Sequence, residues 1–454
     1  MRKKEPIHPD KNEILILKKE KTLIVGSGAR EHALSRSIFK SGHSQELFCV
    51  GSNYNPGITS LCSDFIIDDI NNTKTVASYA KQIGCSLAII GPENPLGEGV
   101  SDALSALGIR VVGPTKSLAQ IETSKSFARN LLAEYNIEGN PTYRTFNSMN
   151  GVRRCLDMFG NDFVVKYDGL AGGKGVRVSG EHFKSKEEAI LHCQTLVSMG
   201  SEFVIEEKLI GEEFSLMSFC DGNTLRHMPA VQDHKRAYEN DTGPNTGGMG
   251  TYSDRDHSLP FLNQEDIEKA QMINEKTAEA LKHKFRQNYK GILYGGFMCT
   301  SNGIKLIEYN ARFGDPEAMN VLSILDSDLV EIFSAITTEK LHQVDVRFLN
   351  KATVCKYAVP KGYPASPLKG KKIDVSSVVD PDGLFFASVD TKNRTLIETG
   401  SRTVAFVGIA NSITEAEKIA ESEICRVQGP LFHRKDIGTK KLVQKRIKNM
   451  ESLR

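Results

Sequence analysis

The sequence predicts an α/β protein of several domains, with a parallel sheet in the first domain and a small strand-rich domain at the end. Three observations carry this prediction. The chain has 454 residues, which is more than one hydrophobic core normally serves. Strand-like and helix-like segments alternate in the first part, and strand-like segments dominate after Asp345. The composition, with 39% apolar and 25% charged residues, is that of an ordinary globular protein.

Charge and cysteine content argue against several classes of protein. The formal net charge of +2 gives no general attraction to nucleic acid or to a membrane surface. The apolar run over residues 14–17 is too short for a secretory signal or a membrane span. The nine cysteines include no C-x-x-C pair, which favours buried free thiols in a reducing cytosol over a disulfide framework or a zinc cluster. We therefore expect a cytoplasmic protein that binds neither nucleic acid nor membrane.

The first domain is predicted over residues 22–123, after a lysine- and glutamate-rich extension over residues 1–21. The extension is interpreted as solvated, with a short pairing strand as the alternative. In the domain, strands are expected at 23–25, 47–50 and 87–90, and helices at 30–39, 73–83 and 99–107. This alternation is typical of a parallel sheet covered by helices. The turn Gly26-Ser27-Gly28 is no dinucleotide fingerprint, because Glu31 stands where a third glycine is expected.

The second domain is predicted over residues 124–340, with a mobile subdomain at about 145–212. A helix at 124–135 leads into it, and its strands are expected at 163–166, 203–206, 294–300 and 304–310, with a hairpin folded at residues 221–223. The stretch 233–250 is polar and glycine-rich, without a periodic pattern. It is predicted to be a loop that becomes ordered around a ligand, with a disordered insertion as the alternative.

The third domain is predicted over residues 341–445. Strands are expected at 353–359, 385–389 and 403–409, followed by a helix at 414–427.

The segment 166–175 predicts a phosphate-binding loop. Its glycines let backbone N–H groups approach phosphate oxygens, while Lys166 and Lys174 neutralise their charge. It is not a Walker loop, because neither Ser nor Thr follows Lys174 and a strand resumes at Val176 where a Walker loop would continue as a helix. A mobile hairpin tip with solvated lysines is the alternative.

In the segment 204–213, an apolar strand leads into an acidic, partly apolar linker, and a second strand follows. Such a linker could offer backbone groups to an adenine edge, while Glu213 binds ribose hydroxyl groups. A charged surface connection between two strands is the alternative interpretation.

The segment 307–317 predicts a metal site. On a strand, Glu308 and Asn310 point to the same face. One carboxylate and one amide oxygen side by side suit Mg²⁺. Arg312, two positions further, could bind a carboxylate or phosphate through two parallel hydrogen bonds. A polar strand end stabilised by a glutamate–arginine pair is the alternative.

Taken in order, these segments resemble the ATP-grasp superfamily and, in detail, the glycinamide ribonucleotide synthetase family. The motifs that carry the resemblance are residues 26–34, 91–96, 166–175, 241–250, 308–317 and 434–438. They extend over the chain from residue 22 to residue 438. The segment 52–58 departs from the family's usual Pro-Gly-Asn-Ala-Gly, although it keeps Asn55 beside a Pro-Gly turn. The resemblance implies that residues 22–123 form the phosphate-binding substrate domain and residues 124–340 the ATP-grasp domain pair.

The resemblance implies a role for each matching residue. A divalent ion, Mg²⁺ or Mn²⁺, would bind Glu308 and Asn310, and the helix N-terminus after Gly28 would bind the ribose phosphate. Lys235, Asp241 and Arg312 would be the catalytic residues. The implied ATP contacts are Lys125, Lys166, Gly172, Gly173, Lys174, Gly175, Glu206, Glu207, Leu209 and Glu213. The implied substrate contacts are Gly28, Arg30, Glu31, Asn55, Pro56, Gly57, Glu93, Asn245 and Thr246.

The implied reaction joins glycine to 5-phosphoribosylamine with ATP, in de novo purine biosynthesis. Glycine would attack the γ-phosphate to give glycyl phosphate and ADP, and the amine would then displace phosphate. We expect positioning and charge neutralisation without a protein nucleophile, and a glycine-rich loop that closes to exclude water. A monomer is the working expectation. The alternatives are an ATP-grasp ligase for another acid or amine and, less favoured, a nucleotide-binding module without catalytic activity.

Overall fold

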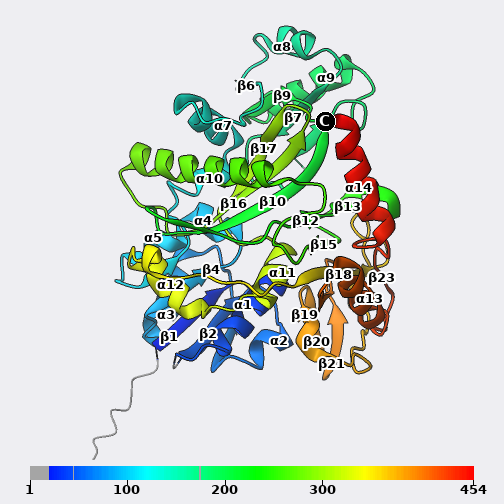
Figure 1. The fold of residues 1–454 in the computed structure, drawn as a ribbon. Coiled ribbons are helices and arrows are strands. Elements are labelled where there is room, and N and C mark those ends of the chain that lie inside the picture. The colour runs from blue at the N-terminus through cyan, green and yellow to red at the C-terminus, as the bar shows by residue number, and fades with distance from the viewer. Residues whose placement is uncertain (1–19, 44, 173–174) are drawn as a thin grey trace, which may run out of the picture.

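The computed structural model describes residues 20–43, 45–172 and 175–454 of the chain. The extension predicted over residues 1–21 lies almost entirely outside the described residues, and Gly173 and Lys174 of the predicted phosphate loop also lie outside them. The N-terminal domain is at the bottom of Figure 1, the middle region is above it, and the C-terminal domain lies beside both. The predicted α/β fold class is confirmed, with a parallel sheet first and a strand-rich domain last.

The first domain contains a five-stranded parallel sheet in the order β3-β2-β1-β4-β5. Leu23, Ile24 and Val25 of the central strand are fully buried, because both faces of such a sheet are covered. The strands are β1 (Glu20–Val25), β2 (Gln45–Gly51), β3 (Asp64–Ile67), β4 (Leu87–Ile90) and β5 (Arg110–Val112). The helices are α1 (Ala29–Phe39), α2 (Pro56–Thr59), α3 (Thr73–Ile83), α4 (Glu93–Glu98) and α5 (Val100–Ser105).

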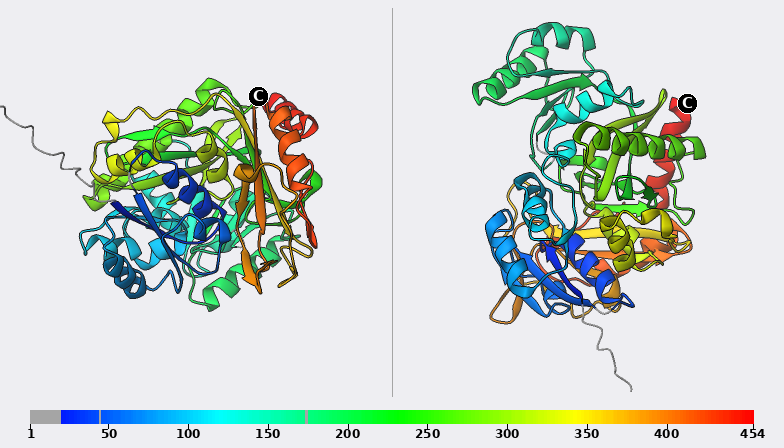
Figure 2. Two further views of the ribbon diagram at one scale, coloured as in Figure 1. Left: turned by 90° about the horizontal axis from the view of Figure 1, so that it is seen from below. Right: turned by 90° about the vertical axis from the view of Figure 1, so that its left-hand side faces the viewer.

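Residues 143–207 form a lobe that projects from the rest of the molecule in Figure 2. Two helices, α6 (Gln120–Thr123) and α7 (Lys125–Glu134), lead into it. Its antiparallel sheet has the order β6-β9-β7-β8. Leu156, Leu196 and Phe203 belong to a hydrophobic core separate from the one shared by the other domains. The elements are β6 (Tyr143–Phe146), α8 (Val152–Phe159), β7 (Phe163–Tyr167), β8 (Val176–Val178), α9 (Lys186–Ser198) and β9 (Phe203–Glu207). That this lobe moves stays a prediction.

The second sheet of the middle region is also antiparallel, in the order β11-β10-β16-β17. The predicted hairpin at residues 221–223 joins its first two strands in sequence. The strands are β10 (Gly211–Cys220), β11 (Leu225–His227), β16 (Gly291–Thr300) and β17 (Gly303–Asn310). The helices that follow or cover it are α10 (Gln264–Phe285), α11 (Glu317–Ser323) and α12 (Leu329–Thr337).

The prediction of an irregular loop over residues 233–250 is wrong in part. The segment contains β12 (Gln232–Asp233), a hairpin of β13 (Arg236–Tyr238) and β14 (Thr242–Asn245), the 3-10 turn η1 (Glu239–Asp241), and the start of β15 (Gly250–Ser253). The strand β15 pairs with the C-terminal domain, so the segment is not a disordered insertion. The sequence of this segment shows no periodicity because polar groups remote in the chain hold it in place. For example, Arg434 donates to the carbonyl of Arg236 at 3.1 Å.

The C-terminal domain is built on a sheet in the order β12-β15-β18-β22-β19, with β23 paired to β18. The single strand predicted at 385–389 is divided into two, and the second part forms a hairpin, β20–β21. The strands are β18 (Ala352–Pro360), β19 (Leu384–Phe386), β20 (Val389–Lys392), β21 (Thr395–Glu398), β22 (Val404–Ala410) and β23 (Leu431–Phe432). The helical segments are η2 (Leu341–Gln343), η3 (Pro381–Gly383), α13 (Ile413–Ile424) and α14 (Lys440–Leu453).

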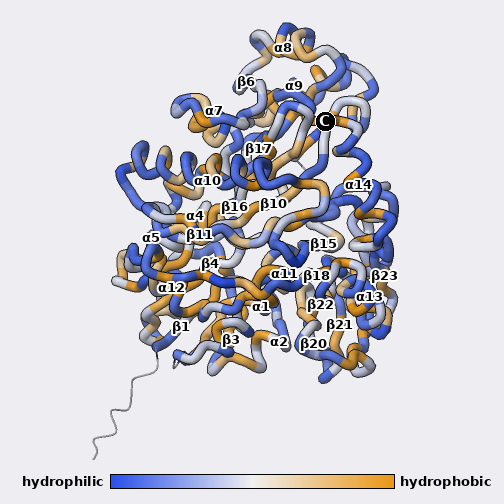
Figure 3. The backbone as a smooth tube through the Cα atoms, in the orientation of Figure 1, coloured by the Kyte–Doolittle hydropathy of each residue, from blue (hydrophilic) through white to orange (hydrophobic). Residues whose placement is uncertain are grey.

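The last helix, α14, was not predicted and returns from the C-terminal domain to the middle region. Asn449 donates to Glu212 of β10 at 2.7 Å, and Arg446 pairs with the same carboxylate at 3.3 Å. The outer helices α10 and α14 carry many hydrophilic residues in Figure 3, whereas apolar residues gather on the inner strands. Among the described residues, no helix is both long enough and apolar enough to span a membrane.

The separate core of the lobe predicts local unfolding when that core is damaged. Leu196 and Leu191 lie on the same helix, α9, but Leu196 is 6% exposed and Leu191 is 65% exposed. We expect Leu196→Ala to destabilise the lobe by about 2–5 kcal/mol through the cavity it leaves. The matched control Leu191→Ala should change stability by less than about 0.5 kcal/mol. Hydrogen exchange should speed up over residues 143–207 only, and equal acceleration in the sheet of the first domain would contradict two separate cores.

Candidate active site

A buried cluster of three charged side chains lies where the lobe meets the second sheet. Arg129 of α7 contacts Glu206 of β9 at 2.8 Å, and Lys166 of β7 pairs with the same carboxylate. All three side chains are at most 5% exposed. Burial alone would raise the pKa of Glu206, but Arg129 and Lys166 hold it below its ordinary value. Glu206 therefore stays ionised, and its charge depends on these two partners.

A bulge in β17 provides the contact that joins this cluster to the second sheet. The register changes at Ile307, since Gly296 lies opposite Glu308 and Phe297 lies opposite Leu306. The carbonyl of the bulged residue Ile307 accepts hydrogen bonds from Arg129 at 2.7 Å and from Lys166 at 2.9 Å. A bulged residue has no place in the strand ladder, so its carbonyl is available to these cations.

The predicted metal ligand Glu308 follows this bulge and lies among cations. Burial alone would raise its pKa, but Lys235, Lys125 and Lys166 hold that pKa below its ordinary value. Asn310, two residues further on β17, accepts a hydrogen bond from Arg312 at 3.1 Å through its side-chain oxygen. A carboxylate that stays ionised beside an amide oxygen is a suitable pair of ligands for a hard divalent ion.

Lys235 enters this region from the segment between β12 and β13. Its ammonium group pairs with Glu213 of β10, and both side chains are about one-third exposed. Although burial lowers the pKa of Lys235, the carboxylates of Glu213 and Glu308 raise it above its ordinary value. The structure thus brings a predicted catalytic lysine beside a predicted ribose contact and a predicted metal ligand.

Arg312 lies between two carboxylates from the start of the chain. It contacts Glu93 of α4 at 3.2 Å and Glu122 of α6 at 3.0 Å. Its charge lowers the pKa of Glu93 to about 2. Glu122 also accepts the backbone N–H of Ala311 at 2.7 Å. The guanidinium therefore ties the end of β17 to the first domain, and a substrate carboxylate or phosphate would share it with these glutamates.

The predicted phosphate loop is anchored at the start of α7. The Nζ atom of Lys125 donates to the carbonyl of Gly169 at 3.0 Å, and Ser124 donates to Asp168 at 3.1 Å. Gly172 adopts a φ of +53°, in the left-handed region that glycine tolerates. Gly175 closes the described part of the loop through its carbonyl, which accepts from Tyr167 at 2.9 Å.

The linker after β9 is arranged differently from the prediction. The side chain of Glu206 points into the ion cluster and is 2% exposed, and its backbone lies between β6 and β7, so its role as an ATP contact stays a prediction. Glu207 accepts the backbone N–H of Thr142 at 2.7 Å. Leu209 lies in the crossover from β9 to β10, where its role as an adenine contact stays a prediction.

The N-terminal turn is held by its own charged residues. The N–H of Gly28 donates to Glu31 at 2.6 Å, and Glu31 also accepts from Arg30 at 2.6 Å. Arg30 reaches the segment after β17 by donating to the carbonyl of Phe313 at 3.1 Å. Glu31 therefore takes part in the cap of α1, and its role as a substrate contact stays a prediction.

The second predicted substrate loop is also committed to internal contacts. Asn55 is fully buried; it donates to the carbonyl groups of Ser27 and Phe386 at 2.9 Å each and accepts from Gly57 at 3.0 Å. Pro56 begins the short helix α2. A Cβ atom on Gly57 would lie 2.1 Å from the His32 ring, so glycine is needed there for packing. The bond from Asn55 to Phe386 joins the first domain to the C-terminal domain.

The predicted catalytic and substrate-binding residues of the 233–250 segment lie in different surroundings. Asp241 pairs with Arg434 at 3.1 Å and with Arg446 of α14 at 2.7 Å, and the structure does not bring it to Arg312. Thr246 holds the backbone of Lys235, since its hydroxyl group donates to that carbonyl at 2.8 Å. Asn245 lies opposite Arg236 in the β13–β14 hairpin.

Several residues that build the site were not singled out from the sequence. Arg402 of the C-terminal domain donates to the carbonyl of Asp315 at 2.8 Å and pairs with its carboxylate at 3.2 Å. Glu317 accepts from the buried hydroxyl group of Tyr294 at 2.7 Å. The sequence could have pointed to such residues only through the motifs that carry the family resemblance. Those motifs include Asp315, Glu317 and Arg434. They do not include Glu122, Arg129 or Arg402.

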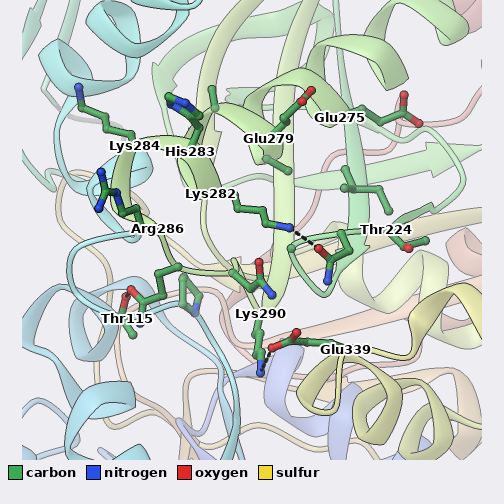
Figure 4. Close-up of a pocket in the computed structure, with 18 of the residues that line it drawn as sticks. Thr115, Thr224, Glu275, Glu279, Lys282, His283, Lys284, Arg286, Lys290 and Glu339 are labelled. Atoms are coloured by element: carbon green, nitrogen blue, oxygen red, sulfur yellow. Dashed lines mark hydrogen bonds and ion pairs between the residues drawn. The ribbon is translucent and has the colours of Figure 1, made fainter.

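A cavity of about 2250 Å³ lies elsewhere, between the end of α10, the strand β5 and the turn after β10. Figure 4 shows side chains of both charges around it, including Lys282, Glu279 and the pair formed by Lys290 and Glu339 at 2.8 Å. None of the predicted site residues lines this cavity. Its size therefore does not locate the active site.

Sequence models of three domains of one family match the chain in order. The N domain of phosphoribosylglycinamide synthetase matches residues 20–122, its ATP-grasp (A) domain residues 123–318, and its C domain residues 353–440. The phosphoribosylamine–glycine ligase of Methanosarcina barkeri is 48% identical over 434 residues, which are 96% of this chain and 100% of that protein. The enzyme of that name from Methanocaldococcus jannaschii is 47% identical over 444 residues, with coverage of 96% and 100%.

Solved structures agree with the sequence comparison. The phosphoribosylamine–glycine ligase of Thermotoga maritima has a TM-score of 0.76 at 27% identity, covering 92% of this chain and 100% of that one. The biotin carboxylase domain of a Hydrogenobacter thermophilus 2-oxoglutarate carboxylase has a TM-score of 0.70 at 14% identity, with coverage of 95% and 94%, which shows a shared fold alone. The geometry of the site and the match over nearly the whole chain lead to one conclusion: the chain belongs to the phosphoribosylglycinamide synthetase family.

Proposed function

We propose that the chain joins glycine to 5-phosphoribosylamine with ATP, forming glycinamide ribonucleotide, ADP and phosphate in purine biosynthesis. The relatives that match over their full length are named for this ligation. The observation that carries the proposal is the electrostatic environment of Glu308, whose pKa is held below its ordinary value by four cations from separate segments, Lys235, Lys125, Lys166 and Arg312. Four cations around one ionised carboxylate suit a triphosphate accompanied by a divalent ion.

Members of the ATP-grasp family use ATP and a divalent metal ion. In our proposal Glu308 and Asn310 hold that ion, either Mg²⁺ or Mn²⁺. The fit is supported by the depressed pKa of Glu308 and by the shared strand β17, which places two oxygen ligands two residues apart. When bound, the ion would neutralise charge on the phosphate oxygens.

The remaining residues would position the substrates. Glycine's carboxylate oxygen bonds to the γ-phosphorus of ATP as the bond to ADP breaks, which gives glycyl phosphate. The amine of phosphoribosylamine then bonds to the acyl carbon, phosphate leaves, and the nitrogen loses a proton. Lys166 and Lys235 would neutralise the triphosphate, and Arg312 would orient the glycine carboxylate. The N-terminus of α1 would take the ribose phosphate.

A cytoplasmic location and a monomeric chain belong to this proposal. The proposed substrates are small molecules, and all nine cysteines are free thiols, which fits a reducing compartment.

ADP release should require ATP, a divalent ion, glycine and phosphoribosylamine together. We would measure it with freshly generated amine, omitting each component in turn and supplying Mg²⁺ or Mn²⁺ separately. Loss of ADP formation on omission of glycine or of the amine is the expected result. ADP release with some other acid or amine in place of either would move the function to a different ATP-grasp ligase.

Glu308→Gln should lower kcat/KM by at least about 100-fold, because it removes the carboxylate charge proposed to hold the metal ion. The fold should persist, since the amide keeps the size of the side chain. Glu279→Gln, an exposed glutamate on α10, is the matched control and should leave the rate unchanged. Near-normal turnover of Glu308→Gln with an unchanged melting curve would remove the metal assignment.

A further inference from the structure

Three side chains with metal-binding atoms lie together in the C-terminal domain, away from the cluster around Glu308. Glu421 lies on α13, Cys425 caps the C-terminal end of that helix four residues later, and His433 follows β23. The Nε2 atom of His433 lies 3.1 Å from Oε1 of Glu421 and 3.9 Å from Sγ of Cys425. The Sγ atom of Cys425 lies 3.5 Å from the same Oε1. One carboxylate oxygen, one thiol and one imidazole nitrogen thus form a small triangle.

The dimensions of this triangle are those of one face of a zinc tetrahedron. Zinc binds sulfur at about 2.3 Å and nitrogen or oxygen at about 2.0–2.1 Å, so neighbouring ligand atoms lie about 3.3–3.6 Å apart. The three observed separations are 3.1, 3.5 and 3.9 Å, so they lie within and on both sides of this range. We propose that Glu421, Cys425 and His433 bind a zinc ion, with water in the fourth position.

The charges around the triangle are compatible with a divalent ion. A thiolate and a carboxylate together balance its two positive charges, and the imidazole is neutral when it binds. Lys356, which is fully buried, contacts Oε2 of Glu421 at 2.7 Å, and His433 lies 3.1 Å from both oxygens of that carboxylate. Lys356 also donates to Glu417 at 2.7 Å and to the carbonyl of Lys435 at 2.8 Å. The lysine therefore orients Glu421, and Oε1, which lies 3.5 Å from Cys425, is the oxygen proposed to bind zinc.

Access to the ion also favours the proposal. Cys425 is exposed, while the side chains of His433 and Glu421 are 12% and 27% exposed. An ion can therefore reach the three side chains from solvent through the exposed Cys425. The sequence expectation of no zinc cluster rested on the lack of a C-x-x-C pair, and that test does not detect ligands from a helix and a later loop.

The ion would tie α13 to the segment that holds the 233–250 region. His433 precedes Arg434, which pairs with Asp241 at 3.1 Å. Asp436 accepts the backbone N–H of Asn240 at 2.9 Å. A bond from zinc to His433 would therefore limit the motion of the residues that anchor this region. The inference goes beyond the proposed ligase activity and does not depend on it.

Cobalt spectroscopy on the full-length protein, without a polyhistidine tag, tests the site. After chelation and dialysis, one equivalent of Co²⁺ should give the near-ultraviolet charge-transfer band of a cobalt–thiolate bond, and Zn²⁺ should abolish it. A Co²⁺ ion held by Glu308 and Asn310 has only oxygen ligands and gives no such band. The Glu308→Gln variant should accordingly keep it, which separates this test from that of the ligase.

Two ligand variants and one matched control complete the experiment. Cys425→Ser and His433→Gln should lose the band and bind zinc at least about tenfold more weakly. Cys62→Ser, which alters a partly buried thiol in the first domain, should keep both properties. Because Cys425 is exposed, its variant should melt as the parent does without zinc. A parent protein without the band, or a Cys425→Ser variant that retains it, would overturn the proposal.

Discussion

The active site depends on the buried ion cluster of Arg129, Lys166 and Glu206. Removing these charges from water is costly, and removing one partner from such a cluster typically costs about 3–5 kcal/mol. The cluster persists because each charge has a partner and because the bulged carbonyl of Ile307 accepts from both cations. The lobe has its own core, and further polar contacts hold it to the rest of the molecule: Asp168 binds the start of α7, and Glu181 pairs with Arg236 of β13.

In the rest of the site, too, cations that a substrate would bind are already paired with carboxylates of the protein. Glu213 pairs with Lys235, Glu206 pairs with Lys166, and two glutamates flank Arg312. A polyphosphate entering this region would compete with side chains that already satisfy each cation. The pair of Glu213 and Lys235 is about one-third exposed, so it costs less to separate than the buried pair of Lys166 and Glu206. Substrate binding is therefore expected to rearrange the pair of Glu213 and Lys235 first.

Sequence reasoning succeeded where a local pattern determines the structure. The central strand of the first sheet is a continuous apolar run, and Glu308 and Asn310 share a face because both follow the bulge. It failed where a remote partner decides the outcome. The segment 233–250 has no period because Arg434, Arg446 and β18 hold it, and the inward orientation of Glu206 depends on Arg129, 77 residues earlier. Spacing along the chain contains no information about such partners.

The C-terminal domain belongs to the architecture of the active site, although no residue proposed to contact ATP comes from it. Its Arg402 holds both the carbonyl of Gly248 and the carboxylate of Asp315, so it joins the 233–250 segment to the loop after β17. Tyr357 adds a bond to the same carboxylate at 2.6 Å. From the other side, α14 holds Asp241. The segment that carries Lys235 is thus held at Asp241 and at Gly248 by residues more than 100 positions later, and a chain cut before residue 352 would lose these constraints together with β18.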